Sequence, residues 1–161
     1  AREAAALAAQ THAGVVRYLA HGVDAGVPWL AMEWVSGTTL SRRLATGPAL
    51  SAREVLLLWR RLSRALAAVH AAGIVHRDVK PGNVMLPGGD VLAAKLTDFG
   101  VARSTTGAID ALTQTGDVVG TISFMAPEQL MGAREIGAPV DVFALGRLIY
   151  ECVLGRPAFG V

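Results

Sequence analysis

The strongest constraint on this chain is the order and spacing of three short motifs. Residues 76–83 read HRDVKPGN, residues 98–100 read DFG, and residues 126–128 read APE. Matching the six fixed positions of the first motif by chance has a probability of about 10⁻⁶ to 10⁻⁵ in a chain of this length. Each tripeptide alone is weak, because such triplets are common in turns. Their order therefore carries the specificity.

The polar residues of these motifs are the types that phosphoryl transfer requires. Asp78 is the candidate catalytic base, because an acceptor hydroxyl needs a carboxylate that orients it and takes its proton. Lys80 can neutralise charge on the moving phosphoryl group, and Asn83 and Asp98 offer the hard oxygen ligands that suit Mg²⁺. The alternative for either aspartate alone is a turn or capping residue.

Composition limits the class of protein. The 161 residues, 52% of them hydrophobic, suit one domain of ordinary size. A net charge of +2, with acidic and basic residues interleaved, argues against a nucleic-acid or anionic-membrane partner. No apolar run reaches the roughly 18 residues of a membrane span, and the first residues do not form a signal peptide. We expect a soluble, cytoplasmic segment, while an anchor elsewhere in a longer protein stays open. The single cysteine, Cys152, is expected to be a small buried hydrophobe on a helix.

Periodicity and turn residues predict a mainly helical chain with short strands. The best helix starts at Ser51, forms a capping box with Glu54 and ends at Gly73, with Trp59 on its apolar stripe. A break is expected at residues 37–39 and a long loop at 103–119, and the first strand pair should turn through Gly22, Asp24 and Gly26. The other expected helices are 2–10, 40–45 and 139–154, and the expected strands are 15–21, 29–35, 83–86 and 94–97.

With these motifs the chain resembles the protein kinases, most closely the bacterial eukaryotic-like Ser/Thr kinases. The resemblance implies an α+β, two-lobe, mainly helical fold, covered here from the family's αC helix to its αF helix. Residues 1–32 would be the end of the small lobe, with the αC helix and two strands, and 33–37 the hinge. Residues 38–161 would be an incomplete large lobe with catalytic loop, activation segment and αF helix. The cofactors implied are ATP and Mg²⁺ (or Mn²⁺), with protein Ser/Thr hydroxyls as acceptors.

The same resemblance assigns residues to the nucleotide. Glu3 stands where the family keeps the helix glutamate that pairs with the nucleotide-binding lysine, and its alternative is a solvated glutamate. Met32 would be the gatekeeper, while the Glu33 carbonyl and the Val35 amide would hold the adenine edge. Met85 would form the adenine floor, although a Met in a strand is more often plain core.

Regulation and specificity are also implied by the resemblance. Thr113 and Thr115 match the positions of activating phosphothreonines, and Arg77 is the expected cation for such a phosphate. The alternative is a polar mobile loop. Thr121 resembles the threonine that marks Ser/Thr specificity, and Lys80 indicates the same specificity.

Four further residues are given structural roles by the resemblance. His76 would be a packing histidine, stacked with Phe99 in a column that also contains Leu7 and Tyr18. Asp141 would accept hydrogen bonds from the backbone of the catalytic loop. Glu128 would pair with an arginine expected after Val161.

A glycine-rich loop and the strand lysine would both precede Ala1, so the segment alone is expected to be an incompetent kinase that aggregates or is molten. Two alternatives stay open: a pseudokinase or scaffold, and a small-molecule phosphotransferase of related fold, which generally lacks the APE segment. The expected partners are a protein substrate and a second kinase copy for trans-autophosphorylation.

Overall fold

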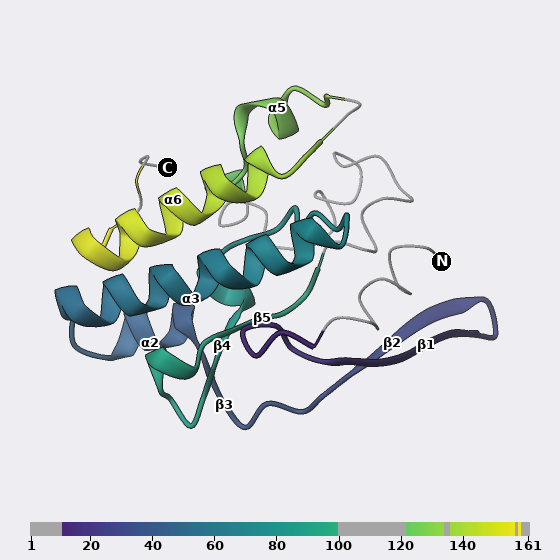
Figure 1. Ribbon diagram of the computed structural model, residues 1–161, viewed down its shortest axis with the longest axis horizontal. Helices are drawn as coiled ribbons and strands as arrows, with labels where there is room; N and C mark the ends of the chain where they lie inside the picture. Colours follow the sequence, from purple (N-terminus) through teal and green to yellow (C-terminus); the bar gives the residue numbers. More distant parts are fainter. Residues whose placement is uncertain (1–10, 100–121, 134–135, 157, 159–161) are drawn as a thin grey trace.

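The computed structural model describes residues 11–99, 122–133, 136–156 and 158 (Figure 1). The helix expected at 2–10 and the loop expected at 103–119 lie outside the described residues. The described part combines helices with two small sheets, as the α+β prediction requires. Its elements are β1 (Tyr18–Asp24), β2 (Val27–Met32), β3 (Gly37–Thr39), α2 (Leu40–Thr46), α3 (Ala52–Ala71), the 3₁₀ turn η1 (Pro81–Asn83), β4 (Val84–Pro87), the 3₁₀ turn η2 (Val91–Ala93), β5 (Lys95–Leu96), α5 (Pro127–Leu130) and α6 (Pro139–Leu154).

Strands β1 and β2 form an antiparallel hairpin that extends away from the helices (Figure 1). The expected pair is present, but both strands lie closer to the turn than predicted. Strand β1 continues through Gly22 to Asp24, and β2 begins at Val27. The turn contains only Ala25 and Gly26, whose φ values are 48° and 82°. Positive φ at both central residues is what a two-residue hairpin turn requires, so this turn sets the register.

The second sheet has the order β3-β4-β5. Strands β4 and β5 are the expected ribbon, whereas β3 occupies residues 37–39, where a break was predicted. That prediction was wrong because Gly37 allows a close approach of two backbones. A Cβ added at Gly37 would lie 2.0 Å from the carbonyl oxygen of Leu86, so a glycine that looks like a breaker permits strand pairing here.

Helix α3 contributes six buried apolar side chains to the core. Ser51 and Glu54 form the predicted capping box, in which the Ser51 hydroxyl accepts from the Glu54 amide and the Glu54 carboxylate accepts from the Ser51 amide. Burying a Leu or Val side chain stabilises a fold by about 1.5–3 kcal/mol, so this stripe is a major source of stability. The buried residues of α3 are Val55, Leu58, Leu62, Ala65, Leu66 and Val69.

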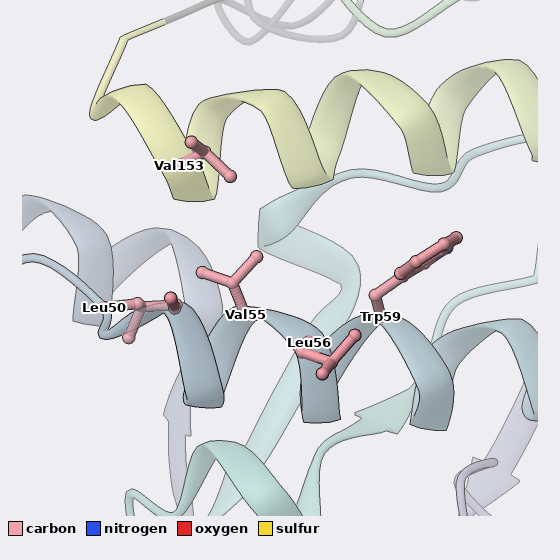
Figure 2. Close-up of a pocket in the computed structure, with 6 residues that line it drawn as sticks. Leu50, Val55, Leu56, Trp59 and Val153 are labelled. Atoms are coloured by element: carbon pink, nitrogen blue, oxygen red, sulfur yellow. The ribbon is translucent and has the colours of Figure 1, made fainter.

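Trp59 differs from its prediction, because 50% of it is exposed. It lies at the edge of the buried stripe, beside a hollow between α3 and the end of α6. Figure 2 shows Val55, Leu56 and Trp59 on one side of this hollow and Val153 on the other. Cys152 is buried on α6, as expected. None of the described helices combines the length and apolarity needed to cross a bilayer.

Candidate active site

The loop before Asp78 is anchored from below by a buried carboxylate. Asp141 lies in the first turn of α6 and is 1% exposed. Its Oδ2 accepts a hydrogen bond from the His76 amide and its Oδ1 one from the Arg77 amide, both at 2.8 Å. The structure thus contains the backbone contact expected of Asp141, which satisfies two donors that would otherwise be costly to bury.

His70 also contacts this carboxylate, and sequence reasoning missed it. Its Nε2 lies 2.7 Å from Asp141 Oδ2, although 71 residues separate the two in sequence. His70 is in the last turn of α3, so the contact joins α3 to α6 beneath the loop. A single histidine in a helix carries no signal for such a partner, and only tertiary packing reveals it.

Asp78, Lys80 and Asn83 lie together in the structure. Lys80 Nζ lies 3.1 Å from Asp78 Oδ2. Asn83 Nδ2 donates to the same Oδ2 at 2.9 Å and to the Asp78 carbonyl at 2.8 Å. The Asp78 side chain is only 14% exposed, so a cation and an amide fix the direction of a largely buried carboxylate.

Asp98 is brought next to Asn83 by the β4–β5 pairing. The Thr97 amide donates to the Asn83 carbonyl at 3.0 Å, which places Asp98 one residue beyond this contact. Asp98 is exposed and has φ of 56°, a left-handed conformation that is uncommon for a residue with a side chain. The two candidate metal ligands therefore lie at one end of the ribbon.

These donors fit a magnesium ion that a nucleotide also ligates. Mg²⁺ is usually held by one or two carboxylates together with phosphate oxygens and water, and Asn83 and Asp98 are donors of this kind. Within the described ranges no three His, Cys, Asp or Glu side chains group as a metal site. The donors thus fit an ion that is shared with a nucleotide phosphate better than an ion held by protein ligands alone.

His76 has the geometry of a packing residue. It is fully buried, and its ring centroid lies 4.4 Å from that of Phe99. Burial lowers the pKa of His76, while Asp141 and Asp78 act in the opposite direction. Because the ring is fully buried and stacked on Phe99, it is poorly placed to take a proton from a substrate. The ring contact that the structure gives Tyr18 is with His21, and Leu7 is outside the described residues.

The expected hinge contains an ion pair that sequence reasoning did not find. The Glu33 carboxylate pairs with Lys95 on β5 and accepts from the Arg17 amide at 3.1 Å, while the Glu33 amide donates to the Arg17 carbonyl. The hydrogen bond from Lys95 and then that from Arg17 lower the pKa of Glu33. The available signal was Lys95 itself, one of only two lysines in the chain.

Three other residues expected to contact the nucleotide lie near this pair. Met32 ends β2, and its Sδ lies 3.9 Å from Thr97 Oγ1, one residue before Asp98. Met85 lies half-buried on β4 opposite Lys95. Val35 is also half-buried.

The remaining predicted residues divide into two groups. Arg77 and Glu128 are described and partly buried, and Glu128 lies on α5. Four other predicted residues lie outside the described residues: Glu3, Thr113, Thr115 and Thr121.

The fold and the site geometry define the class of protein kinase domains. The model of the protein kinase domain family matches residues 1–161, so this chain belongs to the protein kinase domain family. The chain is 41% identical to the serine/threonine-protein kinase PkaA of Streptomyces coelicolor over 99% of its own length and 29% of that protein. It is 45% identical to PknA of Mycobacterium tuberculosis over 81% of its own length and 29% of that protein. The chain therefore spans less than a third of these curated relatives.

Solved structures agree with this assignment. The kinase domain of Mycobacterium tuberculosis PknI matches with a TM-score of 0.77 and 27% identity, over 99% of this chain and 57% of that one. Rad53 in complex with AMP-PNP matches with a TM-score of 0.77 and 28% identity, over 99% of this chain and 38% of that one. The fold of this chain is therefore part of a protein kinase fold.

Proposed function

We propose that the protein containing this chain is a serine/threonine protein kinase that transfers the terminal phosphoryl group of ATP to protein hydroxyls. The observation that carries the proposal is the arrangement around Asp78. Lys80 and Asn83 both contact its Oδ2, and Asp98 lies beside Asn83. Positioning and charge stabilisation supply most of the catalysis of phosphoryl transfer, and these residues can provide both.

In this mechanism Asp78 orients the acceptor hydroxyl and takes its proton as the new O–P bond forms and the bond to the leaving diphosphate breaks. Lys80 neutralises charge on the transferring group, and Asn83 holds the carboxylate in place. Bound Mg²⁺, held by Asn83 and Asp98, would supply neutralisation of the phosphate charge. His76, Phe99, Asp141 and Glu128 have structural roles.

The nucleotide is proposed to lie along the hinge, residues 33–37, between a small-lobe part at 1–32 and a large-lobe part at 38–161. Met32 is the gatekeeper, the Glu33 carbonyl and Val35 amide contact the adenine edge, and Met85 forms its floor. Glu3 is proposed to pair with a lysine of the nucleotide site.

Regulation is proposed to act through the segment before α5. Phosphorylation of Thr113 and Thr115 would add charge for Arg77 to pair with, and such a pair can order a loop. Thr121 is proposed as part of the platform for the protein substrate. Trans-autophosphorylation by a second kinase copy and a cytoplasmic location complete the proposal.

The test is Asp78→Asn in the full-length protein. We expect phosphoryl transfer to a Ser/Thr peptide to fall by at least about 10³-fold, since the base is lost while the shape of the side chain is kept. MgATP affinity, measured by calorimetry, should change less than twofold. Unchanged turnover would remove the role of Asp78, and a wild-type protein that binds MgATP without turnover would favour a scaffold.

A further inference from the structure

Gln129 on α5 makes two hydrogen bonds that reach different parts of the molecule. Its Nε2 donates to the carbonyl oxygen of Arg77 at 3.0 Å, across 52 residues of sequence. Its Oε1 accepts from the Ala126 amide at 3.0 Å, at the start of its own helix. The side-chain amide therefore joins the beginning of α5 directly to the catalytic loop.

The Arg77 carbonyl belongs to the peptide unit that leads into Asp78. The amide of the same unit, on Asp78, donates to His76 Nδ1 at 3.3 Å. Gln129 thus holds the oxygen of this peptide while His76 holds its N–H. The N–H and the C=O of the peptide between Arg77 and Asp78 are therefore both held by side chains. This limits rotation of the backbone just before Asp78.

This restraint acts on Arg77, whose backbone conformation is unfavourable. Arg77 has φ of 65°, in the left-handed region, which costs a residue with a side chain about 1–2 kcal/mol. Asp141 holds the Arg77 amide from below, at 2.8 Å. Gln129 holds the carbonyl of the same residue from the side of α5. An unfavourable conformation persists where its surroundings determine it in this way.

We infer that Gln129 is a positioning residue that sets the orientation of Asp78 and couples the start of α5 to the catalytic loop. This rests on the proposed function of Asp78 as the base. Any movement of α5 that withdraws the Gln129 amide would release the Arg77 carbonyl. The geometry of the base is thereby linked to the position of α5.

Two near-isosteric variants separate the two hydrogen bonds. Gln129→Glu keeps an oxygen for the Ala126 amide but places an acceptor against the Arg77 carbonyl, whereas Gln129→Met removes both contacts. We expect both variants in the full-length protein to lower kcat for peptide phosphorylation by about 10- to 100-fold, the range that a small misplacement of a reacting group produces. The KM for MgATP should change less than twofold. Met131→Glu, at a 78% exposed position beside α5, is the matched control for added charge and should leave kcat unchanged.

The outcomes are distinguishable. A loss of kcat in both variants with an unchanged KM for MgATP supports the inference. A loss in Gln129→Met alone would show that only the helix cap matters and would overturn it. If kcat, MgATP affinity and melting temperature all fall together, the role of Gln129 is purely structural, and the inference is overturned. A wild-type protein without kinase activity would instead overturn the proposed function, and this inference with it.

Discussion

At the scale of single residues, the site depends on side chains that hold other groups in place. Asp141 accepts from two backbone amides and lies 2.7 Å from His70 Nε2. None of these contacts involves a reacting atom. Their effect is to fix the backbone from which Asp78 projects, so the orientation of Asp78 depends on residues from α3 and α6 as well as on the motif.

The Glu33–Lys95 pair should make a pH-dependent contribution to stability. The pKa of Glu33 is lowered from 4.5 in the folded chain, so its stabilising effect is fully present above that value and is lost as pH falls through the lower, folded value. Lys95→Met should reduce the free energy of unfolding by about 1 kcal/mol at pH 7, because both side chains are partly exposed. Urea titrations of the two proteins between pH 3 and pH 7 would measure this.

The control for this pair is Glu33→Gln, which keeps an oxygen for the Arg17 amide and loses only the charge. Its loss at pH 7 should be no larger than that of Lys95→Met, because its oxygen can still accept from Lys95, and it should converge with wild type at low pH. A difference from wild type that stays constant down to pH 3 would mean that the ion pair is not its cause.

At the scale of elements, local signals were predictable and long-range ones were not. Ser51 and Glu54 are three residues apart, so their capping box could be read directly from the chain. Strand β3 could not, because its partner β4 lies almost fifty residues later. Trp59 fits the helical period, yet its exposure depends on how α6 crosses α3. The motif residues around Asp78 were predictable because their spacing is short, whereas the contacts of His70 with Asp141 and of Gln129 with the Arg77 carbonyl are tertiary.

The close approach at β3 gives a prediction for Gly37. Gly37→Ala would place a Cβ 2.0 Å from the Leu86 carbonyl oxygen, so one of the paired strands must shift. We expect a loss of about 1–3 kcal/mol in the free energy of unfolding, the usual cost of overpacking. Chemical denaturation would measure it.

Gly146→Ala is the matched control, because Gly146 lies in α6 with no atom within 4 Å of an added Cβ. This change should stabilise the protein by about 0.5–1 kcal/mol, since alanine is the better helix former. Similar effects of the two substitutions, of the same sign, would argue that backbone entropy and not the contact with Leu86 decides the result at Gly37.

At the scale of the whole molecule, the loop that contains Asp78 lies where several elements meet. Helix α6 supplies Asp141, α3 supplies His70, α5 supplies Gln129, and the β4–β5 ribbon brings Asn83 beside Asp98. The hydrogen bonds that orient Asp78 thus come from elements far apart in sequence. A disturbance of any one of these elements should reach the same short stretch of backbone.

Among the exposed large apolar side chains of the described surface, two groups are candidate sources of self-association. On the hairpin, Val23 is 70% and Val27 65% exposed, and beside the α3–α6 hollow Leu56 is 50% and Val153 60% exposed. Exposed apolar patches favour self-association and bind hydrophobic dyes. We expect the isolated 161-residue chain to bind ANS and to elute above its monomer mass in size-exclusion chromatography.

Substitutions at these two patches would show whether either of them is the source. Leu56→Gln with Trp59→Gln should lower ANS binding and self-association if the hollow dominates, and Val23→Thr with Val27→Thr should do so if the hairpin dominates. All four positions are at least half exposed, so neither pair should cost much core packing. A monomeric wild-type chain with a sharp cooperative melt and no ANS signal would contradict the expectation, because it would mean that these surfaces are tolerated in water as they stand.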